Sequence, residues 1–155
     1  MERTLDFNQK RGFICDMDGV IYHGNQILPG VPEFIQWLHD EQKEFLFLTN
    51  NSGYTPRELQ QKLARMGLDV SEEHFYTSAL ATAAFLKEQA PGCSAFVIGE
   101  AGLFNALYDA GITMNDVNPD YVVIGEARAY SLDTLTKATN LVLAGAKLIG
   151  ANSDT

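Results

Sequence analysis

Two carboxylates lie two residues apart near the start of the sequence, in the run Asp16-Met17-Asp18. Side chains two apart in an extended segment point the same way, so both carboxylates can face one spot. Close like charges repel, and either a cation between them or protonation of one carboxylate relieves that repulsion. Oxygen-only ligands favour a hard ion such as Mg²⁺. Such a pair is more often a solvated turn, so its meaning depends on its place in the fold.

Neutral polar side chains form a second cluster, Thr49-Asn50-Asn51-Ser52. These residues donate hydrogen bonds without carrying a charge or a bulky apolar group. A phosphomonoester is a dianion, so attack on it by a carboxylate needs a cation and neutral donors to offset the repulsion. The acidic pair and the donor cluster would therefore suit phosphoryl transfer if the fold brings them to one crevice.

Apolar runs precede both clusters and predict the strands that position them. Residues 13–15 and 45–48 are apolar at consecutive positions, which favours strands buried on both faces. Between them, apolar residues recur at helical spacing over 31–38. A right-handed crossover through this helix places both strands close together, with their carboxyl ends at the edge where open α/β sheets bind ligands. We therefore expect the acidic pair to lie across one crevice from the donor cluster.

Alternating strands and helices continue along the sequence and predict an α/β fold with a doubly wound, Rossmann-like parallel sheet. A capping box at Thr55 and Glu58 begins a helix that Gly67 can end. Further strands are expected at 74–76, 95–98, 121–124 and 148–149, and helices at 79–88, 103–108 and from 131 onwards. The pattern restarts after the turn at Pro91-Gly92, which implies a second α/β unit.

Two segments of this second unit echo each other: FVIGEA, starting at Phe96, and VVIGEA, starting at Val122. Each is a strand that runs into Gly-Glu before a helix. The repetition predicts the same strand-to-helix turn twice, with Glu100 and Glu126 as solvated turn residues.

Charge and composition narrow the class of protein. Eleven basic and twenty acidic residues give a net charge of -9, and no basic stripe is present that could bind nucleic acid. The two cysteines form neither a disulfide framework nor a metal-binding spacing. No apolar run approaches the ~18 residues of a membrane span, and the start lacks a signal peptide's apolar region. We therefore expect a cytoplasmic protein with no membrane or nucleic-acid partner.

Four runs of the sequence together resemble a known family: CDMDGVIYHGNQILPG from Cys15, LTNNSG from Leu48, FYTSALATAAFL from Phe75 and NPDYVVIGEARAYSLD from Asn118. They look like the NagD-like branch of the haloacid dehalogenase-like (HAD) superfamily of phosphatases. The resemblance implies a magnesium-dependent hydrolase in which a large α/β cap is inserted into a compact core. It places the core's amino-terminal part at 1–79 and the cap at 80–155.

The resemblance also assigns roles to individual residues. Asp16 matches the family's nucleophile, which takes the phosphoryl group, and Asp18 matches its acid and base. Thr49 and Asn50 match the pair that holds the phosphoryl oxygens. Mg²⁺ would be bound by Asp16 through its carboxylate and by Asp18 through its backbone carbonyl. The implied substrates are small phosphorylated metabolites, with nucleoside monophosphates first among them.

The sequence departs from the family pattern at its end. The third-motif lysine and the fourth-motif acidic residues ought to follow the cap, but the chain stops at Thr155. We therefore expect a chain truncated within the cap, whose 155 residues alone are inactive. Two alternatives stay open at this point: a receiver-like, Mg²⁺-binding signalling domain, and a non-catalytic remnant that binds a ligand through the cap. The sequence also leaves open whether the protein is a homo-oligomer.

Overall fold

The computed structural model describes residues 6–152, and these residues form two compact units. The first unit contains the described residues up to Thr49 together with Leu59–Tyr76. The second contains Asn50–Glu58 and the described residues from Thr77 onwards. Each unit has its own parallel sheet with helices, so the predicted α/β class is confirmed.

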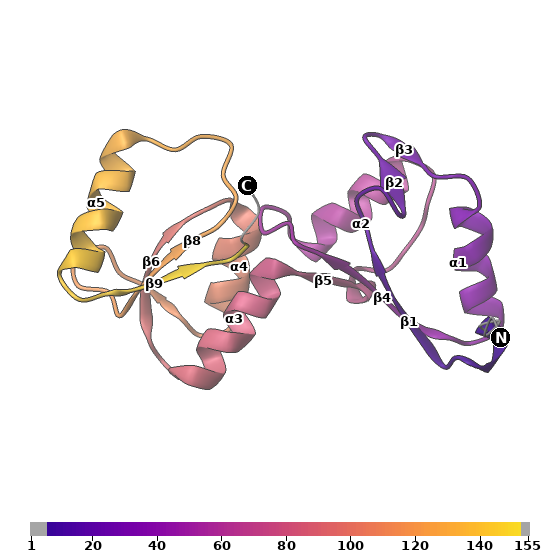
Figure 1. The fold of residues 1–155 in the computed structure, drawn as a ribbon, viewed down its shortest axis with the longest axis horizontal. Helices are drawn as coiled ribbons and strands as arrows, with labels where there is room; N and C mark the ends of the chain where they lie inside the picture. The colour runs from indigo at the N-terminus through magenta and orange to yellow at the C-terminus, as the bar shows by residue number, and fades with distance from the viewer. Residues whose placement is uncertain (1–5, 153–155) are drawn as a thin grey trace, which may run out of the picture. The chain divides into compact units, whose positions relative to one another are not determined.

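The sheet of the first unit has the strand order β1-β4-β5 (Figure 1). Strands β1 and β4 are parallel, with Gly12 opposite Glu44 and Asp16 opposite Leu48. The elements in this part of the chain are η1 (Phe7–Gln9), β1 (Gly12–Asp16), β2 (Tyr22–His23), β3 (Gln26–Ile27), α1 (Val31–Asp40), β4 (Glu44–Thr49), α2 (Pro56–Arg65), η2 (Glu72–His74) and β5 (Phe75–Thr77). The strands predicted at 13–15 and 45–48 are therefore confirmed as β1 and β4.

Aromatic side chains join helix α1 to strand β1. The Phe13 ring lies 5.8 Å from the Phe34 ring and 5.5 Å from the Trp37 ring, both in edge-on geometry, which aromatic pairs prefer. The residues that directly follow these two aromatics in the same helix, Ile35 and Leu38, are buried. The helical spacing seen in the sequence thus produces the apolar stripe by which α1 is held in this unit.

The prediction that β1 and β4 are buried on both faces is wrong. Phe45 and Phe47 are buried, but Ile14 is 74% exposed and Leu48 is 46% exposed. Alternate side chains of a strand point to opposite faces of the sheet. On the face that carries Ile14, Leu46 opposite it is half-buried and Leu48 is exposed, so this face is covered only in part within the described residues. A consecutive apolar run shows only that both faces are apolar, not that both are covered.

The capping box predicted for α2 is present in full. The Thr55 amide donates to Glu58 Oε2 (2.8 Å), and the Glu58 amide donates to Thr55 Oγ1 (3.2 Å). These bonds satisfy two backbone groups that the first turn of a helix leaves without partners. Gly67 follows the helix with a positive φ of 88°, which glycine adopts at no steric cost.

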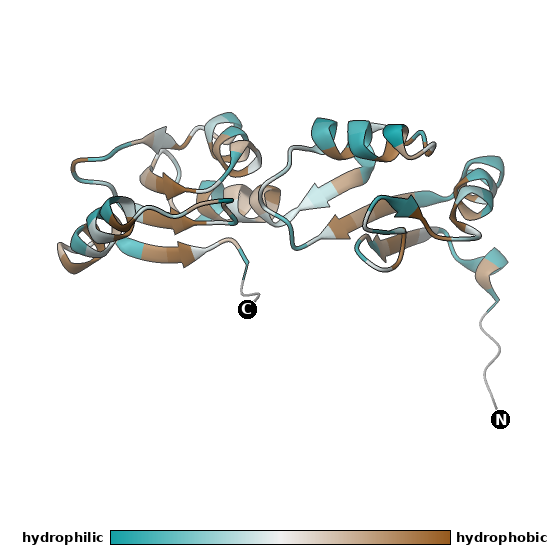
Figure 2. Ribbon diagram, turned by 90° about the horizontal axis from the view of Figure 1, so that it is seen from above, coloured by the Kyte–Doolittle hydropathy of each residue, from teal (hydrophilic) through white to brown (hydrophobic). Residues whose placement is uncertain are grey.

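The second unit is a parallel sheet with helices on both faces. Its strand order is β7-β6-β8-β9. Its elements from Ser78 onwards are α3 (Ser78–Gln89), β6 (Ser94–Ile98), α4 (Ala101–Asp109), β7 (Thr113–Met114), β8 (Tyr121–Ile124), α5 (Leu132–Leu143) and β9 (Lys147–Gly150). Helices α3 and α4 share one apolar core with the sheet, and α5 packs on the other face through Ala138. Figure 2 shows the brown, hydrophobic colour concentrated on the strands, as expected for a sheet covered on both faces.

Every strand and helix predicted for the second unit is found, within a few residues of its expected bounds. The strands that were not predicted, β2, β3 and β7, have two residues each, too few to show a periodic pattern. Among residues 6–152, no helix is long and apolar enough to cross a membrane.

Candidate active site

Strand β1 ends at the acidic pair. Asp16 is the last residue of the strand, and Asp18 forms an isolated β-bridge with Tyr22 just beyond it. Both aspartates are exposed. The amide of Met17 donates to Asp16 Oδ1 at 2.7 Å, which fixes the orientation of that carboxylate relative to the backbone. Two accessible carboxylates therefore lie directly after a parallel strand, where sheets of this kind bind ligands.

Met17 fixes the turn that carries both carboxylates. Its side chain is 0% exposed, although its neighbours on each side are exposed. Its carbonyl accepts hydrogen bonds from the amides of Val20 (3.2 Å) and Ile21 (2.9 Å). Gly19 closes the turn with a φ of 77°, a conformation that favours glycine, and its amide donates to the Tyr22 carbonyl. The buried Met17 side chain thus holds in place the turn that carries Asp16 and Asp18.

Thr49 lies at the same edge of the first sheet. Asp16 is opposite Leu48 in the β1–β4 register, so Thr49 is one residue further along the neighbouring strand. Thr49 is the last residue of β4 and is only 4% exposed. The structure therefore brings Asp16, Asp18 and Thr49 to the carboxyl edge of one sheet.

Asn50 falls in the second unit, although it follows Thr49 directly in the chain. Its side chain is exposed, and its carbonyl accepts a hydrogen bond from Ser78 Oγ at 2.7 Å. The predicted phosphoryl-holding pair is therefore divided between the two units.

The ligands at this edge suit a hard cation held by few protein groups. Mg²⁺ usually keeps several waters and binds through one or two carboxylates, which matches an exposed Asp16 with Asp18 beside it in sequence. Within the described part of the chain, no group of three or more His, Cys, Asp or Glu side chains could hold a metal. Burial raises the pKa of the neighbouring Cys15 thiol, which favours its protonated form.

Comparison with known proteins identifies the family. The model of the haloacid dehalogenase-like hydrolase family matches residues 13–113, which include β1, β4 and the acidic pair. The chain belongs to the haloacid dehalogenase-like hydrolases. The resemblance predicted from the sequence runs is confirmed at this level.

The relatives are phosphatases by name. The chain is 47% identical to dihydroxyacetone phosphatase of Corynebacterium glutamicum (strain R), over 92% of this chain and 52% of that protein. It is 44% identical to ribonucleotide monophosphatase NagD of Escherichia coli (strain K12), over 94% of this chain and 58% of that protein. The chain thus spans little more than half the length of these curated relatives.

Solved structures agree with the sequence comparisons. NagD from E. coli K-12 matches with a TM-score of 0.88, over 94% of this chain and 58% of that chain. Glycerol phosphate phosphatase from Mycobacterium tuberculosis, solved in complex with magnesium, matches with a TM-score of 0.84 at 29% identity, over 95% of this chain and 45% of that chain. The fold of the chain and its NagD-like relationship are therefore established.

A small polar cavity of about 140 Å³ lies at the carboxyl edge of the second sheet of this HAD-like chain. Its lining includes Asn51, Tyr54, Glu100, Glu126 and Arg128. The two glutamates occupy turns, as predicted, but each accepts a specific hydrogen bond. Glu126 Oε2 accepts from Asn51 Nδ2 (2.6 Å), and Glu100 Oε1 accepts from the Arg128 amide (2.8 Å). Glu126 is exposed, as predicted for a solvated turn residue, and Glu100 is half-buried. The sequence did not predict their hydrogen-bond partners; the repeated Gly-Glu after each strand was the available signal.

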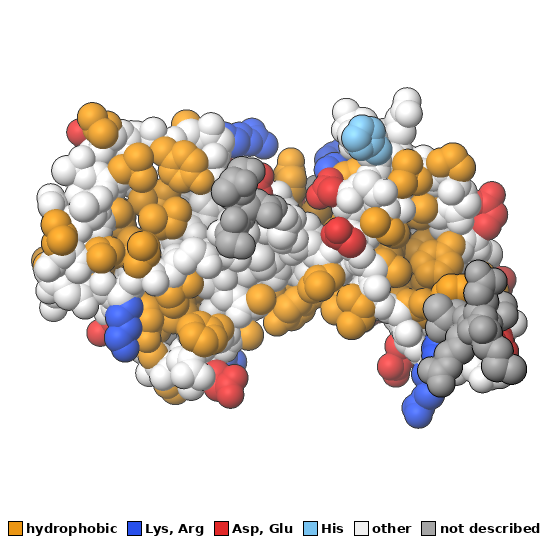
Figure 3. Space-filling view, viewed as in Figure 1, with side chains coloured by type: hydrophobic (Ala, Val, Ile, Leu, Met, Phe, Trp, Pro, Cys, Tyr) orange, Lys and Arg blue, Asp and Glu red, His pale blue; other side chains and the backbone are white. Residues whose placement is uncertain are grey.

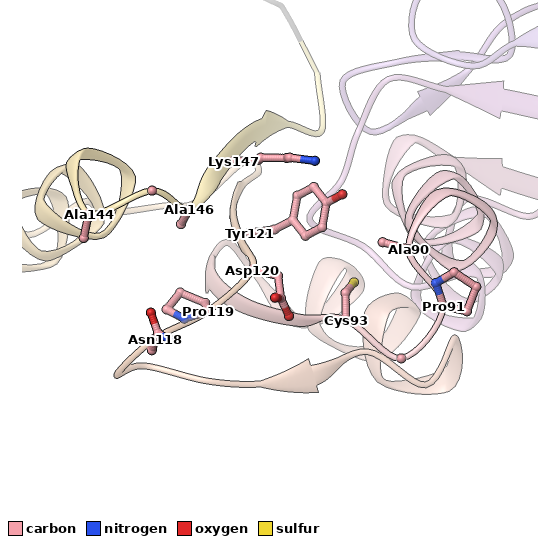
Figure 4. A pocket seen from close by; sticks show the side chains of 12 residues that line it. Ala90, Pro91, Cys93, Asn118, Pro119, Asp120, Tyr121, Ala144, Ala146 and Lys147 are labelled. Carbon is pink, nitrogen blue, oxygen red and sulfur yellow. The ribbon is translucent and has the colours of Figure 1, made fainter.

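A larger hollow of about 660 Å³ lies at the opposite, amino edge of the second sheet. Figure 4 shows Tyr121 and Lys147 on one side of it and Cys93 and Pro91 on the other. Asp120 also lines this hollow, but its carboxylate already accepts hydrogen bonds from the amide and hydroxyl of Ser94. Ligand sites of parallel sheets lie at the carboxyl edge, so size alone does not make this hollow the candidate site.

Proposed function

We propose that the protein hydrolyses small phosphomonoesters through an aspartyl-phosphate formed on Asp16. The observation that carries the proposal is the placement of Asp16, Asp18 and Thr49 at one edge of the parallel β1–β4 pair. Membership of a hydrolase family supports it. So do relatives named as phosphatases at 44–47% identity.

Each residue has a defined part in the proposed reaction. Asp16 Oδ attacks phosphorus, the P–O bond to the ester oxygen breaks, and the phosphoryl group is transferred to the carboxylate. Asp18 gives a proton to the departing alkoxide and then takes one from the water that hydrolyses the acyl phosphate. Thr49 and Asn50 donate hydrogen bonds to the equatorial phosphoryl oxygens.

The proposed cofactor is Mg²⁺, held by the Asp16 carboxylate and the Asp18 backbone carbonyl. The bound ion would offset the negative charge that gathers when a carboxylate meets a phosphate dianion. The magnesium complex of the related glycerol phosphate phosphatase supports this assignment. Within this chain, the exposed Asp16 and Asp18 provide the hard oxygen ligands that such an ion prefers.

We further propose that residues 1–79 are the amino-terminal part of the catalytic core and that residues 80–155 belong to the cap. Nucleoside monophosphates are the proposed substrates, in line with the ribonucleotide monophosphatase relative. The dihydroxyacetone phosphatase and acid sugar phosphatase relatives make triose and sugar phosphates the natural competitors. A cytoplasmic location and the absence of nucleic-acid and membrane partners stay predictions from the sequence.

The test is a substrate panel on the complete protein. Nucleoside monophosphates, dihydroxyacetone phosphate, a hexose phosphate and 4-nitrophenyl phosphate are compared by kcat/KM with Mg²⁺ and with excess EDTA. We expect turnover that disappears with EDTA and is fastest, among the natural esters, on a nucleoside monophosphate. Binding of Mg²⁺ without turnover of any ester would favour the receiver-like or non-catalytic alternatives. Preference for a triose or hexose phosphate would overturn only the substrate assignment.

A further inference from the structure

The turn that follows the donor cluster, Asn51–Tyr54, is held tightly within the second unit. Asn51 Oδ1 accepts hydrogen bonds from the amides of Gly53 and Tyr54, both at 2.9 Å. Ser52 is 0% exposed, a degree of burial that is unusual for a serine in a loop. The internal bonds give the turn its shape, and the buried serine shows that the turn is packed against other parts of the unit.

Glu126 is the residue to which this turn is bound. Its carboxylate accepts from Asn51 Nδ2 at 2.6 Å, and its backbone amide donates to Ser52 Oγ at 2.7 Å. These contacts join residues 74 and 75 positions apart in the chain. The carboxylate acceptor makes the Asn51–Glu126 bond a charge-assisted one.

Two glycines allow the Asn51–Tyr54 backbone to pack closely against neighbouring segments of the second unit. A Cβ at Gly102 would lie 2.5 Å from the Tyr54 carbonyl oxygen, and one at Gly125 would lie 2.8 Å from Ser52 Oγ. The Gly102 amide also donates to the Gly53 carbonyl at 2.9 Å. Gly125 lies in the second of the two similar strand-to-helix turns, and Gly102 lies in the first turn of α4, which follows the other one. Both places therefore accommodate the Asn51–Tyr54 backbone.

We propose that Glu126 is a positioning residue for the phosphoryl-holding Asn50. It fixes Asn51 through its carboxylate and Ser52 through its amide, and these are the two residues that follow Asn50 in the chain. On the other side of the turn, Ser78 Oγ holds the Asn50 carbonyl. Asn50 is therefore fixed from its own carbonyl onwards, which restricts the directions in which its side chain can donate. This inference rests on the proposed function only for the role of Asn50.

The test compares Glu126→Ala with Glu126→Gln in the complete protein. Alanine removes the acceptor for Asn51 Nδ2 but keeps the backbone amide that donates to Ser52, whereas glutamine keeps an acceptor oxygen. Amide hydrogen exchange at Gly53 and Tyr54 should rise by about tenfold in the alanine variant, because losing a charge-assisted bond frees the turn to open. In NMR spectra, the side-chain amide resonance of Asn50 should shift in the Glu126→Ala variant. The Glu126→Gln variant should restore most of the wild-type exchange rate and most of the wild-type resonance position.

Enzyme kinetics add a readout that a purely structural role would not change. With 4-nitrophenyl phosphate, KM should rise about fivefold in the Glu126→Ala variant with a smaller change in kcat, because a donor that binds the phosphoryl group similarly in the ground state and the transition state affects mainly KM. Glu100→Ala is the matched control, since Glu100 occupies the equivalent Gly-Glu position but accepts its bond from the Arg128 amide. The control should raise exchange at Gly53 and Tyr54 much less than Glu126→Ala does, because Glu100 lies beside Gly53 only through carbon atoms.

The outcomes separate the two proposals. Unchanged exchange in the Glu126→Ala variant, or an equal rise in the Glu100→Ala control, would overturn the role of Glu126 in holding the turn. Faster exchange with an unshifted Asn50 amide would overturn the positioning of Asn50. A wild-type protein without phosphatase activity would overturn the proposed function instead, and the Asn50 resonance would still decide the positioning role.

Discussion

The carboxyl edges of the two sheets carry acidic residues at equivalent places but use them differently. In the first unit, Asp16 and Asp18 are exposed on either side of a buried methionine. In the second unit, Glu100 and Glu126 each hold another segment of the chain through a hydrogen bond. A carboxylate that holds a distant segment of the chain contributes to structure, whereas an exposed carboxylate bonded only to the adjacent backbone amide, as Asp16 is, can meet a cation or a substrate. Position at the edge of a parallel sheet is therefore not sufficient evidence for catalysis; the partners of the carboxylate decide.

Removing the nucleophile should show the largest effect. We expect Asp16→Asn to lower the turnover of 4-nitrophenyl phosphate by the complete protein more than about a thousandfold, because an amide cannot attack phosphorus. Asp18→Asn should reduce kcat more than it reduces binding. The control is Asp120→Asn, which changes an aspartate at the opposite edge of the second sheet. Near wild-type turnover by the Asp16 variant would show that the accessible carboxylate is not the nucleophile.

The 155-residue chain by itself should be a poor catalyst. The chain spans 52–58% of the length of its curated phosphatase relatives, so groups that the rest of the complete protein supplies would be absent from the assay. Each missing stabilising group costs about 3 kcal/mol of barrier, so we expect turnover at least about a hundredfold below that of the complete protein. Assays of both proteins with saturating Mg²⁺ make the comparison. Equal rates would show that the edge of the first sheet is sufficient without further groups.

Disturbing the close contact between Gly102 and the Tyr54 backbone should destabilise the fold. A Cβ there meets the Tyr54 carbonyl, a backbone atom that cannot move aside alone. We expect Gly102→Ala to lower the free energy of unfolding by about 1–3 kcal/mol, measured in urea. Gly53→Ala is the matched control in the same contact region, because its Cβ would meet atoms only at an ordinary 3.7 Å. Equal losses in both variants would argue against tight packing of the Asn51–Tyr54 turn.

The capping box of α2 should contribute about 1 kcal/mol. Thr55→Ala removes the hydroxyl that accepts from the Glu58 amide, and loss of such a cap typically costs this much. Thr136→Ala serves as control, because that exposed hydroxyl only donates to a carbonyl within its own helix. Urea unfolding of both variants measures the difference, and no loss in the Thr55 variant would contradict the role of the cap.

Replacing Asp120 should have a small, pH-dependent effect on the stability of the fold. Hydrogen bonds from the backbone amide and the hydroxyl of Ser94 hold the pKa of Asp120 below its usual range. Its stabilising contribution is therefore complete above the ordinary carboxyl pKa of about 4 and is lost as pH falls through the lowered folded pKa. Unfolding measured across that acid window should be less pH-dependent in Asp120→Asn than in the wild type. If the free energy of unfolding depended on pH equally in both proteins, these hydrogen bonds would not stabilise the folded state.

Local signals in the sequence predicted most elements of the fold. The Thr55–Glu58 capping box and the helical spacing over 31–38 each reflect contacts within a few residues, so they could be read without the tertiary structure. The placement of Asp16 and Thr49 followed from the topology of a parallel crossover, which has one common handedness. The exposure of Ile14 was not predictable, because burial depends on what covers a face.

The network around Glu126 could not be read from the sequence for a similar reason. Its bonds join residues more than seventy positions apart, and no periodic pattern records such a pairing. The glycines Gly102 and Gly125 were visible, but their purpose depends on which backbone comes close to them. Only coordinates could show that this backbone is the Asn51–Tyr54 turn.

Met17 changes how the acidic motif should be searched for in other sequences. A search for two aspartates separated by any residue treats the middle position as free, yet here that side chain is fully buried and its carbonyl ties down the following turn. The middle residue therefore sets the spacing at which the two flanking carboxylates emerge. A stricter search would require a large apolar residue between the two aspartates and a glycine after the second one. It would discard many solvated acidic pairs that satisfy the looser pattern by chance. The same requirement warns protein engineers that a polar residue at position 17 would displace both carboxylates at once.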